Sequence, residues 1–151
     1  MVVLGIKGAS LPSGTNIPEN CYVGDYILYT ELFKYASVFV ANGGYGGVNL
    51  SISHGVPIVI GGIDGDKPLT SARLVWSGCG FDLKRATPTP EHVRHAVDVI
   101  QSNPEYRKRA LEMQQEAKTC DPLSTIVEEI NAMAEGKHAD GTKLESFVSG
   151  S

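Results

Sequence analysis

The sequence predicts an α/β fold in which helices flank an open parallel sheet. Short apolar runs rich in β-branched residues alternate with segments of helical periodicity, and glycine-rich turns follow two of these runs. Continuous apolar strands indicate burial on both faces, and a helix between consecutive strands is typical of parallel crossovers. The 151 residues, of which 42% are hydrophobic and 20% charged, are enough for one ordinary domain with a single core.

The predicted strands are brief and are bounded by glycine or polar residues. They are VVLGI at 2–6, SVFVA at 37–41, PIVIG at 57–61 and GFDL at 80–83. Consecutive strands joined by helical crossovers usually lie next to each other. We therefore expect the turns after the second and third strands to meet at one edge of the sheet.

Two crossover helices follow from the same pattern. In the first, Val48 and Ile52 fall four residues apart on one helical face, and Gly55 stands where helices often end in the left-handed conformation. The second has Pro68 near its first position and Gly78 as its terminator. Its spaced apolar set consists of Leu69, Ala72, Val75 and Trp76.

Three later segments each open with a capping residue followed by proline, namely Thr89-Pro90, Asn103-Pro104 and Asp121-Pro122. Proline in the first helical turn loses no needed hydrogen bond, so these pairs predict three helices. From Gly136 onward the sequence has no periodicity. We therefore expect a domain over residues 1–135 and a flexible tail over residues 136–151.

Ligands of open parallel sheets bind beyond the carboxyl ends of the strands, and two turns there carry suitable groups. The first, residues 42–47, is glycine-rich and opens a helix, so its backbone N–H groups could bind phosphate. Taken alone it is equally consistent with a tight structural turn. It matches neither GxGxxG nor the P-loop.

The second turn, residues 61–68, carries Asp64, Asp66 and Lys67 just ahead of a helix. A carboxylate accepts hydrogen bonds from hydroxyl groups and an ammonium donates to them, so this turn could bind a polyhydroxyl group. The alternative is an N-capping aspartate beside a solvated lysine. Two polar turns on one sheet edge favour a binding site over either structural alternative.

Composition argues against several classes of function. The formal charge is −4 without a basic run, so we expect no nucleic-acid partner. No apolar stretch approaches the roughly 20 residues that span a bilayer, so we expect no membrane span. Three cysteines without a CxxC pair suggest a reducing, cytoplasmic setting. His92 and His95 lie three apart on a predicted helix, but no carboxylate or cysteine constellation accompanies them, so we predict no metal site.

The stretch from FVANGGYGG to GFDL, residues 39–83, resembles the donor-binding segment of the family-1 UDP-glycosyltransferases, which have the GT-B fold. That family shows a glycine turn led by histidine, then Gly-Val-Pro at the end of the following helix, then Asp-Gln before the next helix. Here Gly55-Val56-Pro57 and Asp66-Lys67 keep this register relative to the glycine turn. The resemblance covers roughly residues 1–135 and implies a Rossmann-like, partial C-terminal domain of a GT-B glycosyltransferase.

The resemblance implies a role for each matching position. Asn42 replaces the histidine that contacts the donor phosphate, and Asp66 and Lys67 match the pair that binds the sugar hydroxyls. Tyr26 matches the tryptophan that stacks on uracil, although it could equally be a core aromatic residue. The implied nucleotide-sugar-binding residues are Tyr26, Ile27, Asn42, Gly44, Gly46, Gly47, Val48, Asp66 and Lys67.

Some positions depart from the family pattern. Lys67 replaces glutamine, which keeps a donor, loses an acceptor and adds a charge, so the identity of the donor sugar stays open. Leu50 stands where plant members carry a glutamate for the ribose hydroxyls. Leu28 and Tyr29 stand in for the proline and glutamine of an upstream motif.

The resemblance implies transfer of a hexose, with glucose expected, from a UDP-sugar to a small lipophilic hydroxyl acceptor with inversion. UDP-sugar is then the donor substrate, and we expect no cofactor. The family's acceptor pocket and histidine base belong to an amino-terminal domain that has no counterpart in this sequence. We therefore expect no catalytic residue in this chain, which resembles a fragment or separately encoded half and should be inactive alone. The acceptor domain would come from the same longer chain or from a partner chain.

Two alternatives stay open. The first is a non-catalytic UDP-sugar-binding subunit that acts with a partner acceptor domain. The second is a dinucleotide oxidoreductase domain, which fits the sheet but requires a GxGxxG turn and an acidic ribose residue that the sequence lacks.

Overall fold

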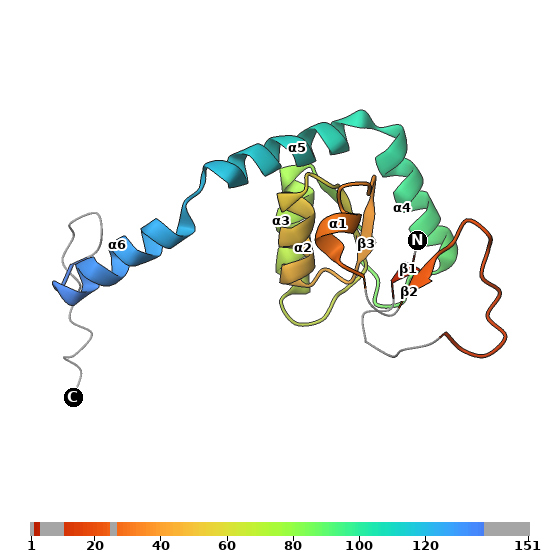
Figure 1. Ribbon diagram of the computed structural model, residues 1–151. Helices are drawn as coiled ribbons and strands as arrows, with labels where there is room; N and C mark the ends of the chain where they lie inside the picture. Colours follow the sequence, from red (N-terminus) through yellow and green to blue (C-terminus); the bar gives the residue numbers. More distant parts are fainter. Residues whose placement is uncertain (1, 4–10, 25–26, 138–151) are drawn as a thin grey trace. The chain divides into compact units, whose positions relative to one another are not determined.

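The computed structural model describes residues 2–3, 11–24 and 27–137, which form two compact units (Figure 1). The first unit extends to Gln114 and the second begins at Gln115. Residues 4–6 of the first predicted strand, Tyr26 and most of the predicted tail lie outside the described residues. The expected boundary between a domain of residues 1–135 and a tail therefore stays a prediction.

A three-stranded parallel sheet forms the centre of the first unit. Its strands are β3 (Phe39–Ala41), β4 (Ile58–Ile60) and β5 (Gly80–Asp82), in the order β3-β4-β5. Phe39 pairs with Ile58, and Ile58 pairs with Gly80. The strands coincide with three of the predicted apolar runs, so the predicted parallel sheet is confirmed. Because β3 and β4 are neighbours, the turns that follow them leave the same edge.

A second, two-stranded sheet pairs β1 (Val2–Val3) with β2 (Val23–Gly24) in parallel. The short helix α1 (Tyr29–Leu32) follows. The sequence pattern predicted neither β2 nor α1. Strands of two residues and a helix of four are too short to show hydrophobic periodicity.

The crossover helices are α2 (Tyr45–Ser53) and α3 (Lys67–Ser77), as predicted. Gly55 follows α2 with φ +64°, and Gly78 ends α3 with φ +80°, so both have the left-handed conformation expected of helix terminators. Pro68 lies in the first turn of α3, where its missing N–H group costs no hydrogen bond.

The spaced apolar set of α3 does not form its buried face. Leu69, Val75 and Trp76 are exposed, and Trp76 retains 89% of its accessible surface, whereas Ser71 and Leu74 are buried. Leu74 turns inward because Gly80 leaves room for it: a Cβ atom at Gly80 would overlap the Leu74 side chain. The glycine on the neighbouring strand, which the helical pattern does not include, thus decides which face of α3 meets the sheet.

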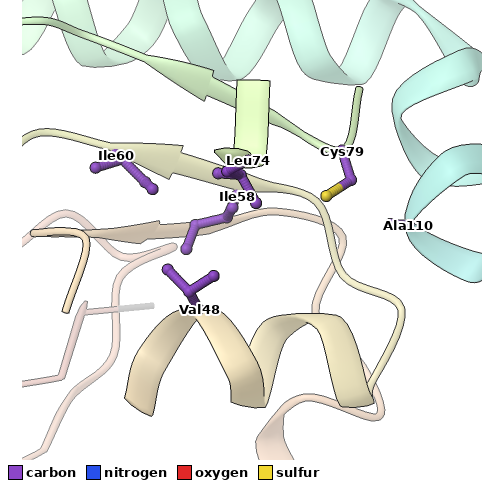
Figure 2. Packing of buried hydrophobic residues seen from close by; sticks show 6 residues of the cluster. All are labelled: Val48, Ile58, Ile60, Leu74, Cys79 and Ala110. Atoms are coloured by element: carbon purple, nitrogen blue, oxygen red, sulfur yellow. The ribbon is translucent and has the colours of Figure 1, made fainter. Parts of the chain in front are cut away.

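The two faces of the sheet bury different clusters because side chains alternate along β4. Ile58 and Ile60 point to one face, which α2, α3 and α5 (Pro104–Thr119) cover. Figure 2 shows this cluster, which consists of Val48, Ile58, Ile60, Leu74, Cys79 and Ala110. Val59 points to the other face, which α4 (Pro90–Ser102) covers with Ala96 and Ile100.

The three predicted proline-initiated helices are confirmed as α4, α5 and α6 (Pro122–Ala134). Their capping residues act as expected. Thr89 Oγ1 accepts from the His92 N–H, Asn103 Oδ1 from the Glu105 N–H and Asp121 Oδ1 from the Ser124 N–H. At Asp121, hydrogen bonds from the Ser124 hydroxyl and the Ser124 N–H hold the pKa of the exposed carboxyl below its usual value, with the hydroxyl as the main cause.

Helix α6 belongs to the second unit and has one exposed apolar face. Its exposed apolar residues are Leu123, Ile126, Val127, Ile130 and Met133. These positions follow the helical spacing of a single stripe. The helix contains Glu128 and Glu129 but no lysine or arginine. We call this surface the α6 stripe.

Candidate functional site

The two polar turns predicted from the sequence lie against each other at the carboxyl edge of the sheet. The first follows β3 and the second follows β4, and Gly61 N–H donates to the Ala41 carbonyl where the strands end. One residue further on, Gly62 lies so close to the first turn that a Cβ atom there would overlap the Asn42 carbonyl oxygen. The structure therefore brings the glycine turn and the Asp66-Lys67 turn together.

Asn42 shapes the first turn with its own side chain. Its Oδ1 accepts a hydrogen bond from the Gly44 N–H at 3.1 Å, while Gly43 has φ +83°. A Cβ atom at Gly43 would also lie 2.5 Å from Ile60 Cγ2, so this position needs glycine for both conformation and space. With Oδ1 engaged inside the turn, the Asn42 side-chain nitrogen is the group that could donate to a ligand.

The start of α2 offers backbone donors. Its N-cap residue is Gly44, so no side chain caps the helix. The first hydrogen bond of the helix runs from the Val48 N–H to the Gly44 carbonyl. The N–H groups of Tyr45, Gly46 and Gly47 come before that bond and have no acceptor within the helix. A Cβ atom at Gly46 would meet nothing within 4 Å, so an anion can approach the backbone there.

Gly47 and Val48 lie deeper than Gly46. A Cβ atom at Gly47 would be 3.4 Å from Phe39 Cε1, which is ordinary contact. The Val48 side chain is buried in the core, and its N–H is already bonded within the helix. Val48 therefore anchors the start of α2 to the hydrophobic core. A direct contact between Val48 and a ligand remains a prediction.

In the second turn, Asp66 occupies the N-cap position of α3 but its side chain makes no capping hydrogen bond. The structural alternative, an N-capping aspartate, therefore does not describe this residue. Asp66 is exposed, and Lys67 is half-buried with its side chain over Gly62: a Cβ atom at Gly62 would be 2.5 Å from Lys67 Cδ. The turn that contacts the glycine turn thus carries a carboxylate and an ammonium, and groups of this kind can bind hydroxyl groups.

A cleft of about 270 Å³ runs between α2 and α3, next to both turns. Tyr45, the first residue of α2, and Asp66, the N-cap of α3, line it together with the apolar side chains of Ile52 and Leu69. Tyr45 is 65% exposed. Tyr45 is not among the site residues predicted from the sequence, although an aromatic residue inside a glycine turn is a signal that could have found it.

The predicted base-binding residues are described only in part. Ile27 is half-buried and packs near Gly24, where a Cβ atom would lie 3.3 Å from its side chain. Tyr26 lies outside the described residues. Stacking of Tyr26 on uracil therefore remains a prediction.

The described histidines have structural contacts. His92 takes part in the capping box of α4, His95 packs edge-on against Phe81, and His54 Nδ1 lies 2.9 Å from the Leu50 carbonyl oxygen at the end of α2. In the part of the chain that the structure describes, no group of three histidine, cysteine or acidic side chains could hold a metal ion. Within the same residues, no helix is both long and apolar enough to cross a membrane.

A parallel sheet with a glycine turn that opens a helix at its carboxyl edge is the arrangement of nucleotide-binding α/β domains. Comparison with known proteins identifies the family. Residues 1–133 match the family described as erythromycin biosynthesis protein CIII-like, C-terminal domain. The chain therefore belongs to this family of GT-B glycosyltransferase C-terminal domains, which confirms the resemblance.

Two relatives of this chain are described as UDP-glucosyltransferases. UDP-glucosyltransferase B1 of Starmerella bombicola is 43% identical over 132 residues, which cover 85% of this chain and 31% of that protein. UDP-glucosyltransferase 1 of Beauveria bassiana is 42% identical over 130 residues, which cover 86% of this chain and 28% of that protein. The chain thus spans less than a third of the length of these relatives.

Solved structures confirm the α/β fold. Spinosyn forosaminyltransferase SpnP matches with a TM-score of 0.73 at 23% identity, over 83% of this chain and 34% of that one. Glycosyltransferase VinC, solved in complex with dTDP, matches with a TM-score of 0.72 at 23% identity, over 80% of this chain and 30% of that one.

Proposed function

We propose that this chain is the donor-binding part of a UDP-dependent glycosyltransferase, with the functional domain over residues 1–135. The observation that carries the proposal is the contact at Gly62 between the turn that leads into α2 and the turn that carries Asp66 and Lys67. The first N–H groups of α2 have no acceptor within the helix, and the Asp66 carboxylate makes no capping hydrogen bond. The first set suits a diphosphate and the second suits a sugar. A UDP-sugar contains both groups, covalently joined.

In the reaction that we propose, a hexose, with glucose expected, passes from UDP to a small lipophilic alcohol with inversion. The acceptor oxygen forms a bond to the anomeric carbon as the bond from that carbon to the diphosphate oxygen breaks. The leaving diphosphate keeps the electron pair, and the acceptor's proton goes to a base. This chain would stabilise the leaving group through the N–H groups of Gly46 and Gly47 and the Asn42 amide.

We propose that the acceptor-binding half lies elsewhere, in the same longer chain or in a partner chain. The α6 stripe supports this, because its five exposed apolar side chains need a covering surface. The family match includes α6, since it extends to residue 133. The helix has acidic and no basic residues, which suits a protein surface and not an anionic lipid surface.

This part of the proposal can be tested by mixing the chain with the amino-terminal part of a related glucosyltransferase. We expect glucosyl transfer only in the mixture, and loss of that activity in Ile126→Lys with UDP binding unchanged. Glu128→Gln, which makes the same change in charge on the opposite side of α6, should retain the activity. Equal activity in all three mixtures would contradict a role for the α6 stripe.

The alternative of a non-catalytic UDP-sugar-binding subunit remains a second proposal. It predicts that the mixture binds UDP-glucose and an acceptor but transfers no sugar.

We also propose a cytoplasmic setting. The argument for it is that the three cysteines form no CxxC pair.

The direct test of the proposed function is calorimetric titration of the chain with UDP, UDP-glucose and NAD. We expect saturable binding of UDP and UDP-glucose and none of NAD. A ligand that binds only the folded chain stabilises it by RT ln(1 + [L]/Kd), so a rise in melting temperature with UDP but not with NAD gives an independent check. Binding of NAD in place of UDP would favour the oxidoreductase alternative and overturn the proposal.

A further inference from the structure

Gly62 is the point at which the two turns meet. It follows β4 by two residues, and it faces the backbone of Asn42 from across the sheet edge. Its φ is not in the left-handed region, unlike that of Gly43 or Gly65. Glycine at this position is therefore required by space and not by backbone conformation.

The space around Gly62 is filled from two sides. A Cβ atom there would overlap the Asn42 carbonyl oxygen and would lie 3.1 Å from the Asn42 carbonyl carbon. The same atom would be 2.5 Å from Cδ of Lys67. One neighbour is backbone of the proposed diphosphate turn, which cannot move without changing that turn, and the other is the side chain of the proposed sugar-binding lysine.

We propose that Gly62 is a positioning residue that couples diphosphate recognition to sugar recognition, an inference that rests on the proposed function. Gly62 lets Lys67 lie directly over the junction of the turns. The Lys67 ammonium and the N–H groups at the start of α2 can then bind the same ligand. A side chain at residue 62 would push Lys67 and the second turn away from the first. The sugar would then lose its contact with Lys67 while the diphosphate retained its N–H donors on α2.

The neighbouring Gly61 provides a matched control. A Cβ atom at Gly61 would meet Leu83 Cδ1 at 3.5 Å, Pro88 Cγ at 3.6 Å and the Ala41 oxygen at 4.0 Å, all ordinary contacts. Gly61→Ala therefore changes the same chemistry one residue away without forcing the turns apart.

The experiment compares the ratio of UDP-glucose affinity to UDP affinity in the wild-type chain, Gly62→Ala and Gly61→Ala. We expect Gly62→Ala to lower this ratio about tenfold, the effect of losing one hydrogen bond from a charged donor, and Gly61→Ala to leave it unchanged. An equal fall for both variants, or an equal loss of UDP and UDP-glucose affinity in Gly62→Ala, would overturn the inference. Failure of the wild-type chain to bind UDP would instead overturn the proposed function.

A double-substitution cycle separates positioning from general damage. If Gly62 acts through Lys67, Gly62→Ala should not lower the ratio of UDP-glucose affinity to UDP affinity any further in a Lys67→Ala background, and additive losses would contradict this.

A measurement on the wild-type chain covers the case in which Gly62→Ala fails to fold. The Gly62 amide resonance should move more with UDP-glucose than with UDP, and identical movement with both ligands would overturn the coupling.

Discussion

The Asn42 side chain accepts a hydrogen bond from the Gly44 N–H at 3.1 Å, so the residue proposed to contact the donor phosphate also holds the glycine turn in shape. A histidine at this position, as in the family-1 UDP-glycosyltransferases, would present a ring nitrogen to the ligand. Asn42 instead uses its oxygen within the turn and leaves its nitrogen for the phosphate. The two roles of this amide can be separated by substitution.

Asn42→Asp should weaken UDP binding by tenfold or more while leaving the fold intact. Aspartate keeps an oxygen to accept from Gly44 but removes the donor and places a negative charge against the diphosphate, and a hydrogen bond to a charged group contributes about 1.5–3 kcal/mol. Calorimetry and thermal melting measure the two effects. As a comparison, Asn42→Ala should lose both roles, so its melting temperature should fall as well. Unchanged UDP affinity in Asn42→Asp would remove Asn42 from the site.

Gly46→Asp should weaken UDP binding strongly, because it places an anion where the diphosphate is proposed to lie. Gly46 is a cleaner position for this test than Gly47, whose Cβ atom would contact Phe39 Cε1. The loss of affinity should shrink as salt concentration rises, because salt screens exposed charges. Gly46→Ala serves as the control: with nothing within 4 Å of its Cβ atom, it should fold normally and cost less affinity than the aspartate. Equal effects of the two substitutions would mean that no anion lies there.

Asp66→Asn should reduce affinity for UDP-glucose and leave affinity for UDP unchanged. The Asp66 carboxylate makes no capping hydrogen bond, so its replacement should cost α3 only the helix-dipole contribution of about 0.3–1 kcal/mol. Competition of each ligand against a fluorescent UDP analogue measures both affinities. A loss of UDP affinity equal to that of UDP-glucose would place the carboxylate next to the nucleotide and not the sugar.

Cys79 should react slowly with thiol reagents in the folded chain. Only 2% of its surface is accessible, and burial raises the pKa of its thiol, so at neutral pH it stays in the unreactive protonated form. Cys120 is exposed and should react first. Mass-spectrometric mapping of alkylation at pH 7, with and without denaturant, measures the order. Rapid labelling of Cys79 without denaturant would contradict the packing of the core cluster.

Much of the fold could be predicted from the sequence because its signals are local. The apolar runs of β3, β4 and β5 and the proline-initiated helices α4, α5 and α6 depend on residues close together in the chain. The buried face of α3 could not be predicted, because Leu74 packs into the space that the missing side chain of Gly80 leaves on strand β5. The elements β2 and α1 were too short to produce a pattern.

The candidate site divides in the same way. That the two turns share an edge follows from the adjacency of β3 and β4, which the crossover pattern predicts. The contact of Gly62 with Asn42 could not be predicted, because it depends on the distance between two backbones and not on any side-chain pattern. The absence of a cap from Asp66 also depends on the geometry at the start of α3.

In the proposed function, the turn after β3 binds the diphosphate and the turn after β4 binds the sugar of one UDP-sugar molecule. The most direct measurement is a titration of the isotopically labelled chain with UDP and then UDP-glucose, followed through backbone amide resonances. We predict that UDP moves the amides of residues 42–48, and that UDP-glucose additionally moves those of Asp66 and Lys67. Unmoved amides at residues 42–48 with millimolar UDP would rule out the turn after β3 as the diphosphate site.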